Sequence, residues 1–160
     1  MIRAIRTDDC ASIAAIEAQT FNTALDRGRL LTLMKMRAFC GFVDDTNIPN
    51  SAYRQNNPDM SGNLVGYLLA TIIVDEAEIL SIAVSSDHQK CGRGTGLLVH
   101  FLAYIDAQDV KTALLEVAAD NVSALTLYQR HGFAEFGRRA SYYKRSVGDC
   151  DAIMMRRLSD

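Results

Sequence analysis

The apolar and polar residues along the chain alternate between strand-like and helix-like spacing. Apolar residues at every second position, or in short continuous runs, predict strands, whereas apolar residues three and four apart predict helices. Clusters of polar turn residues separate these segments. The predicted elements are, in chain order, a strand at 2–6, a helix that begins within 7–9 and ends near Thr20, a helix at 26–37, strands at 38–43, 64–74 and 78–84, a helix at 95–107, a strand at 111–118, a helix at 121–131, and strands at 133–139 and 151–158.

This order of elements predicts an α/β fold in which helices pack on a mixed sheet. The 160 residues are enough for one hydrophobic core and too few for two comfortable ones, so we expect a single domain that spans residues 1–160. No internal repeat or low-complexity tract interrupts the pattern.

One segment, residues 44–63, breaks the alternation. It contains both prolines of the chain, five asparagines and few apolar residues, which predicts a long polar loop. Connections of this length are unusual within a compact domain. Two interpretations remain open, a mobile insertion and a lid on the substrate side.

Composition excludes several classes of protein. The net charge of −2 provides no bulk positive field, so we expect no direct nucleic-acid partner. No apolar run approaches 18 residues and the N-terminus lacks a signal-like core, which predicts a cytoplasmic protein without a membrane span. The four cysteines show neither a CxxC pair nor zinc-ligand spacing, so we expect free thiols and no metal.

A glycine-rich loop at 85–94 lies between the predicted strand at 78–84 and the helix that follows it. Such a loop lets the backbone approach a ligand closely, and the start of a helix offers unpaired N–H groups to phosphate oxygens. The loop lacks the Lys-Ser/Thr pair of a Walker A motif, and its glycines are spaced GxGxG instead of GxGxxG. What remains is Q-x-x-G-x-G, formed by Gln89, Gly92 and Gly94, which by itself indicates an anion site or simply a glycine-rich helix start.

A second motif lies downstream, N-x-x-A-x-x-L-Y-x-x-x-G-F, which runs from Asn121 through Tyr128 to Phe133. With both motifs at this separation, the chain resembles the GNAT superfamily of N-acetyltransferases. The resemblance covers residues 64–158, whereas residues 1–63 agree in the order of elements only. Within the superfamily, the segments DEAEILSIAV and LEVAADN and the closing R-x-x-Y-Y (Arg139, Tyr142, Tyr143) are most similar to the ribosomal-protein-alanine N-acetyltransferases.

The resemblance implies a GNAT fold, with a mixed, mostly antiparallel central sheet flanked by helices, and acetyl-CoA as the co-substrate. In the family, main-chain N–H groups of the glycine loop bind the pyrophosphate, a strand aligns the pantetheine arm, and an asparagine bonds that arm. Carried over to this sequence, the cofactor-binding residues are Ile82, Val84, Gln89, Lys90, Cys91, Gly92, Arg93, Gly94, Thr95, Gly96, Asn121 and Tyr128.

Two side chains are candidates for proton transfer. Glu116 ends an apolar strand, where partial burial would raise the pKa of its carboxyl towards that of a useful base; spacing alone also allows an ordinary solvent-facing glutamate. Tyr128 is protonated at neutral pH and can donate to a departing thiolate, although it can equally be an ordinary core tyrosine. The resemblance implies the catalytic role for both residues.

The acceptor is an amine that the sequence does not identify. Tyr142 and Tyr143 either line the acceptor site or merely cover a strand end. An α-amine has a pKa of about 8 and a lysine amine one of about 10.4, so a carboxylate base deprotonates the α-amine more easily. The resemblance implies a protein N-terminus of the ribosomal protein S18 type, and the pKa comparison favours the same acceptor. A small amine, an antibiotic or a lysine side chain is the alternative, and a non-catalytic acyl-CoA-binding module is a third reading.

Overall fold

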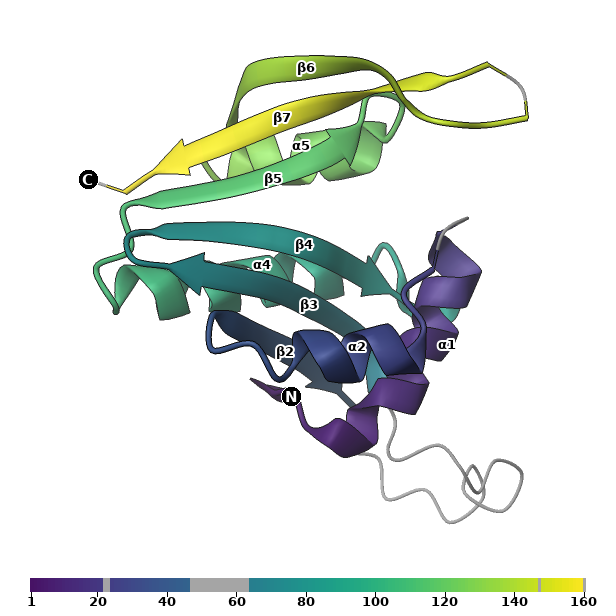
Figure 1. Ribbon diagram of the computed structural model, residues 1–160, viewed down its shortest axis with the longest axis vertical. Coiled ribbons are helices and arrows are strands. Elements are labelled where there is room, and N and C mark those ends of the chain that lie inside the picture. The colour runs from purple at the N-terminus through teal and green to yellow at the C-terminus, as the bar shows by residue number, and fades with distance from the viewer. Residues whose placement is uncertain (22–23, 47–63, 147, 160) are drawn as a thin grey trace.

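The computed structural model describes residues 1–21, 24–46, 64–146 and 148–159, whose strands form one seven-stranded sheet (Figure 1). The order across the sheet is β1-β2-β3-β4-β5-β7-β6, and β4 with β5 is the parallel pair in an otherwise antiparallel sheet. The strands are β1 (Ile2–Ala4), β2 (Phe39–Asp45), β3 (Leu64–Ile73), β4 (Glu76–Val84), β5 (Thr112–Ala118), β6 (Ala134–Tyr143) and β7 (Cys150–Leu158). The predicted mixed, mostly antiparallel sheet is thereby confirmed.

Helices cover both faces of the sheet. One face carries α1 and α2, and the other carries α4 and α5 (Figure 1). Their bounds are α1 (Cys10–Thr20), α2 (Arg27–Leu33), α4 (Arg93–Asp106) and α5 (Val122–Arg130), and two short 3₁₀ turns lie at Thr7–Asp9 and Ser86–His88. Among the described residues the chain order of helices and strands is the predicted one.

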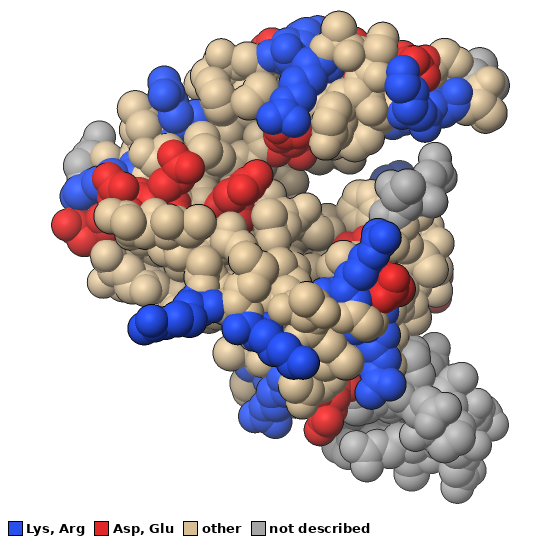
Figure 2. Space-filling view, in the orientation of Figure 1, with Lys and Arg blue, Asp and Glu red and all other residues tan. Residues whose placement is uncertain are grey.

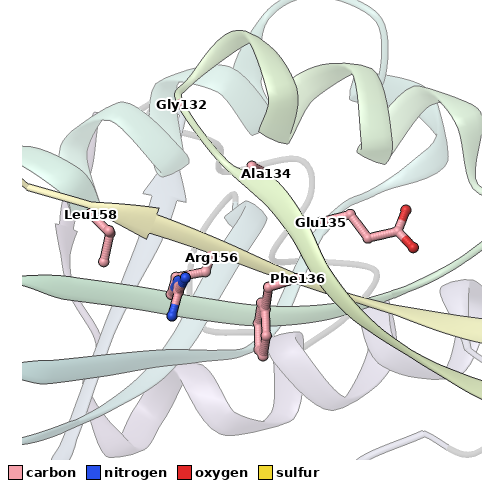
Figure 3. Close-up of a pocket in the computed structure, with 6 residues that line it drawn as sticks. All are labelled: Gly132, Ala134, Glu135, Phe136, Arg156 and Leu158. Carbon is pink, nitrogen blue, oxygen red and sulfur yellow. The ribbon is translucent and has the colours of Figure 1, made fainter.

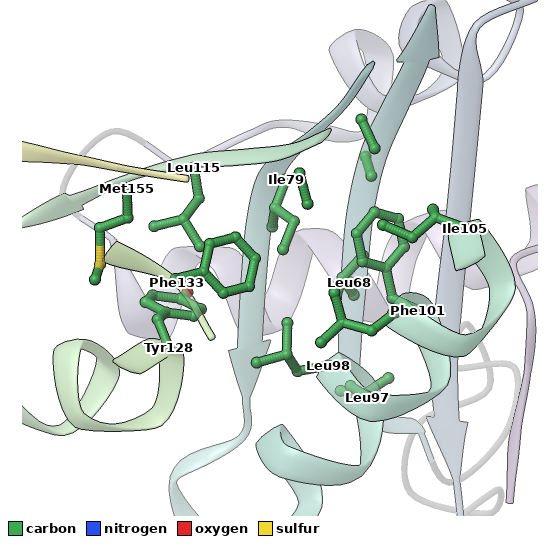
Figure 4. Close-up of a cluster of buried hydrophobic side chains, with 14 of the residues drawn as sticks. Leu68, Ile79, Leu97, Leu98, Phe101, Ile105, Leu115, Tyr128, Phe133 and Met155 are labelled. Atoms are coloured by element: carbon green, nitrogen blue, oxygen red, sulfur yellow. The ribbon is translucent and has the colours of Figure 1, made fainter. Parts of the chain in front are cut away.

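Each face of the sheet has its own apolar cluster. On the α4/α5 face, Leu68, Phe101 and Leu115 belong to the larger cluster, part of which Figure 4 shows. On the α1/α2 face, Ile13 and Leu30 pack on the other side of β3 and β4. Strand β3 is buried over most of its length because both layers cover it, which explains its continuous apolar run.

Several predicted boundaries were wrong, and the two largest differences are in α2 and β6. The second helix ends at Leu33 instead of residue 37, because hydrogen bonds from Lys35 to Thr32 and from Met36 to Leu33 turn the chain out of the helix. Strand β6 continues to Tyr143, four residues beyond the predicted end at Arg139. The segment predicted as a polar loop contributes its first two residues to β2, and residues 47–63 lie outside the described residues, so the insertion and the lid both stay predictions.

A buried carboxylate fastens α1 to the sheet. Glu17, at 3% exposed, accepts hydrogen bonds from the hydroxyl groups of Tyr67 and Ser81, the latter at 2.7 Å. Its other oxygen accepts the Leu25 N–H at 3.1 Å, which orders the connection that leads into α2. A buried charge is tolerated when several donors satisfy it, as they do here. The network joins the N-terminal helices to β4 at Ser81.

Candidate active site

The sheet opens between β4 and β5. The two strands pair only from Glu76 with Thr112 to Ile79 with Leu115, and beyond that point they diverge (Figure 1). The pairing of β4 with β3 jumps from Ile79 to Ser81 at this position, so Leu80 is an extra, bulged residue. A bulge bends its strand, and here it turns the end of β4 away from β5. Figure 2 shows a hollow in the surface between the part built from β5–β7 and the part that carries α1.

The diverging end of β4 presents a free strand edge towards this opening. The Ser85 N–H donates to the Val65 carbonyl at 2.8 Å, so Ser85 faces β3. Backbone N–H and C=O groups of successive residues in an antiparallel strand point alternately to its two sides. Because those of Ser85 point to β3, those of Val84 point to the opening, and so do those of Ile82, two residues earlier. The Gln89 side chain donates to the Val84 carbonyl at 2.9 Å. The Val84 N–H and both backbone groups of Ile82 remain on this edge.

The glycine loop forms a nest of free N–H groups at the start of α4. Gly92 is the N-cap of α4 with φ of 81°, and Lys90 also has a positive φ of 60°. No backbone carbonyl or side chain of the described residues accepts a hydrogen bond from the N–H groups of residues 90–95. The Gly96 N–H, in contrast, donates to the Gly92 carbonyl at 2.9 Å and closes the first helical turn. Consecutive free donors at a helix N-terminus are suited to binding an anion.

Two side chains of the loop, those of Cys91 and Arg93, bond to other groups of the protein. The Cys91 thiol donates to the His88 carbonyl at 2.7 Å, and the Arg93 guanidinium pairs with the carboxylate of Asp44 in β2 at 2.8 Å. Asp44 is buried, which opposes its ionisation, but hydrogen bonds from Arg93 and from the Met1 amino group outweigh this and lower its pKa. The guanidinium of Arg93 is therefore engaged, and the backbone of the loop is what faces outward.

Glu116 lies at the vertex of the opening. It is the first residue of β5 beyond the last pair with β4, and 24% of its side chain is exposed. Its Oε1 forms an ion pair with the Arg139 guanidinium of β6 at 3.1 Å. Sequence reasoning gave Arg139 no role. The R-x-x-Y-Y motif contained the residue, but no local pattern reveals which carboxylate it reaches.

Tyr128 lies on α5, on the other side of the sheet, with 5% of its surface exposed. Its ring meets Phe133 edge-on, with the centroids 5.8 Å apart (Figure 4). Burial raises the pKa of the phenol, and the nearby Tyr143 adds to this shift. The hydroxyl is protonated at neutral pH and makes no hydrogen bond to any described residue.

Asn121 and the two closing tyrosines complete the predicted set. The side-chain oxygen Oδ1 of Asn121 caps α5 by accepting the Ala124 N–H at 3.2 Å, and the side-chain NH2 group has no partner among the described residues. The rings of Tyr142 and Tyr143 meet edge-on at 5.2 Å. Burial raises the pKa of Tyr143, and the carboxylate of Glu116 adds to it. Tyr143 thus contributes to the raised pKa of Tyr128, and Glu116 contributes to that of Tyr143.

A separate hollow lies at the edge strand of the sheet (Figure 3). The Arg156 guanidinium stacks over the Phe136 ring there at 5.4 Å. The residues that line it are Gly132, Ala134, Glu135, Phe136, Arg156 and Leu158, and none belongs to the predicted site.

Two properties of the described residues bear on other kinds of site. They contain no group of three or more His, Cys, Asp and Glu side chains placed to hold a metal ion. They also contain no helix long and apolar enough to cross a membrane.

Comparisons with known proteins agree with this architecture. The profile of the Acetyltransferase (GNAT) family matches residues 32–133. The [ribosomal protein bS18]-alanine N-acetyltransferase of Escherichia coli K12 is 37% identical over 95 residues, which are 59% of this chain and 64% of the relative. The match therefore spans slightly less than two thirds of that relative's length.

Solved structures match over almost the whole chain. The crystal structure of the ribosomal-protein-S18-alanine N-acetyltransferase from Escherichia coli has a TM-score of 0.85 and 26% identity, covering 99% of this chain and 92% of that one. A ribosomal-protein-alanine N-acetyltransferase from Brucella melitensis, at 19% identity and a TM-score of 0.80 over 99% of both chains, shows the same fold. The predicted fold is confirmed.

Proposed function

The chain belongs to the acetyltransferase (GNAT) family, and we propose that it is an acetyl-CoA-dependent N-acetyltransferase that acetylates a primary amine. The observation that carries this proposal is the opening between β4 and β5, which has a free strand edge on one side and a nest of unpaired N–H groups at its end. An extended pantetheine arm fits such an edge, because amide groups pair with it as an added strand does. The pyrophosphate fits the N–H groups of residues 90–95.

In the proposed reaction the amine and the thioester meet at the vertex of the opening. Glu116 accepts a proton from the acceptor ammonium, and the neutral nitrogen attacks the thioester carbon. The Val84 N–H lies on the free edge, where it would polarise the thioester oxygen. As the carbon–sulfur bond breaks, the Tyr128 hydroxyl protonates the departing thiolate. As the adduct collapses, the nitrogen loses its second proton, which replaces through solvent the proton that Tyr128 gave to the thiolate, and Glu116 releases its proton to water. Protons and electron pairs then balance without a covalent enzyme intermediate.

The raised pKa of Tyr128 keeps the phenol protonated at neutral pH, so its proton is present when the thiolate forms beside it. The residue is buried, but its hydroxyl oxygen is not fully enclosed, and it has no hydrogen-bond partner among the described residues, so its proton is available for the sulfur. Asn121, with free amide donors at the start of the same helix, would bond the pantetheine arm. The helix α5 would then position both groups along one cofactor.

For the acceptor we propose the N-terminal α-amine of a protein, of the ribosomal protein S18 type. The relative with 37% identity over 95 residues bears that activity in its name. An α-amine with a pKa of about 8 also requires less of a carboxylate base than a lysine amine at about 10.4. Tyr142 and Tyr143 would flank the acceptor. A ribosomal-protein substrate would place the enzyme in the cytoplasm.

A panel of acceptors tests this proposal. The protein is mixed with acetyl-CoA and with peptides whose free N-terminus or lysine is selectively blocked, together with small amines, and free thiol release is followed. We expect turnover on peptides with a free α-amine. Turnover on lysine side chains or small amines alone would contradict the acceptor class. Tight CoA binding without turnover on any amine would leave the acyl-CoA-binding module.

A further inference from the structure

We propose that Arg139 is a positioning residue for Glu116, which fixes the carboxylate so that one oxygen faces the incoming amine. This inference rests on the proposed function, because it assigns to Glu116 the role of base. The observation behind it is the ion pair at 3.1 Å between the Arg139 Nη2 and the Glu116 Oε1. The second carboxylate oxygen has no donor among the described residues.

The guanidinium reaches Glu116 across an intervening strand. Arg139 in β6 pairs with Ala152 in β7, which in turn pairs with Ala118 in β5, while Glu116 lies two residues before Ala118 on the same face. Cross-strand neighbours on one face are about 5 Å apart. Because both neighbours in this row are alanines, the long side chain has room to extend over β7 towards the carboxylate.

A second contact restrains the same guanidinium. Arg139 stacks over the Tyr142 ring at 5.4 Å, and Tyr142 meets Tyr143 edge-on. A planar guanidinium can pair with a carboxylate and stack on a ring at once, which an ammonium cannot do. Arg139 thus links the proposed base to the two tyrosines proposed to flank the acceptor. The titratable groups that interact with Tyr143 include Tyr128, Glu116, Tyr142, Cys150 and Arg145.

The arrangement has a consequence for the reaction. The terminal torsion of a glutamate is broad, so an unrestrained carboxylate samples many orientations. Arg139 occupies Oε1 and leaves Oε2 for the acceptor ammonium, so that the acceptor and the guanidinium bind the same carboxylate without competing for one oxygen. Loss of Arg139 should therefore slow proton removal and leave acetyl-CoA binding intact.

The variant Arg139→Gln tests this directly, with Arg138→Gln as the matched control. Arg138 lies on the same strand with 49% of its side chain exposed, against 51% for Arg139, and pairs with Glu135 and Asp151 instead. We expect Arg139→Gln to lower kcat about tenfold, a fraction of a full acid–base contribution, with the KM for acetyl-CoA unchanged. Arg139→Lys should recover part of the rate, and Arg138→Gln should match the wild type.

A double-mutant cycle separates positioning from a structural role. If Arg139 acts through Glu116, then Arg139→Gln made in the Glu116→Gln protein changes kcat less than about twofold, because the group that it positions is already absent. Full multiplication of the two effects would overturn the inference. If Arg139→Gln has the wild-type kcat while Glu116→Gln has a lowered kcat, the positioning role of Arg139 is overturned and the base role of Glu116 is kept. Wild-type kcat in Glu116→Gln would overturn the base assignment and this inference with it.

Discussion

At the scale of single residues, the hydroxyl of Tyr128 is the atom whose removal is most informative. The ring packs on Phe133 and the hydroxyl bonds to no described residue, so Tyr128→Phe should fold like the wild type. We expect kcat to fall about 10²-fold, the lower end of a general-acid contribution, with little change in acetyl-CoA affinity. Steady-state kinetics with both substrates varied would measure this. An unchanged kcat would remove Tyr128 from the role of acid.

The raised pKa of Tyr128 also predicts how kcat depends on pH. A phenol whose pKa lies above its ordinary value of 10.0 stays protonated throughout the neutral and mildly alkaline range. We therefore expect no loss of kcat from deprotonation of Tyr128 as the pH rises from 7 to about 10. A pH profile of kcat measures this, with Tyr128→Phe as the control. A fall in wild-type kcat near pH 8 that is absent from the variant would contradict it.

At the scale of elements, the start of α4 depends on Gly92. Its φ of 81° is unfavourable for any residue with a Cβ, although a Cβ there would meet nothing within 4 Å. Gly92→Ala should therefore cost about 1–2 kcal/mol through the backbone alone and tilt the free N–H groups away from a pyrophosphate. We expect the Kd of CoA to rise up to about tenfold, measured by calorimetry.

Gly132→Ala is the matched control for that prediction. Gly132 has a similar φ of 85° at the end of α5, and a Cβ there meets only the Arg157 side chain at ordinary contact distance. It should lose similar stability in urea unfolding while CoA affinity stays near the wild-type value. Equal losses of CoA affinity in both variants would mean that the loop geometry does not matter.

The helices and strands were largely predictable from the sequence, whereas the contacts between residues of different strands were not. The Q-x-x-G-x-G loop and the motif that ends at Phe133 are local, and short-range spacing reveals each of them. The opening between β4 and β5 depends on the bulge at Leu80, which the apolar run of β4 hides. The pairing of Arg139 with Glu116 spans three strands, and its register follows from a shift in β6 that no local pattern contains.

At the scale of the whole molecule, Asp44 joins the N-terminal part of the sheet to the cofactor loop. The buried carboxylate lies in β2 and pairs with Arg93, the first residue of α4, at 2.8 Å. The Met1 amino group contacts the same side chain at 3.2 Å. A charged carboxylate bonded in this way couples three segments that are distant in sequence, so its titration should affect the stability of the entire fold.

The sign of that effect follows from the lowered pKa of Asp44. A carboxyl whose folded pKa lies below its usual value of 3.8 stabilises the protein above that value, and the contribution is lost as the pH falls through the folded pKa. We expect Asp44→Asn to lower the free energy of unfolding by about 1–2 kcal/mol at pH 7, and by less at pH 3. Urea unfolding at both pH values measures the difference. Asp109→Asn is the control, because this carboxylate is 84% exposed and its ion pair with Lys111 contributes little at either pH. A gap between wild type and Asp44→Asn that widens at pH 3 would show that the buried ion pair does not hold the loop to the sheet.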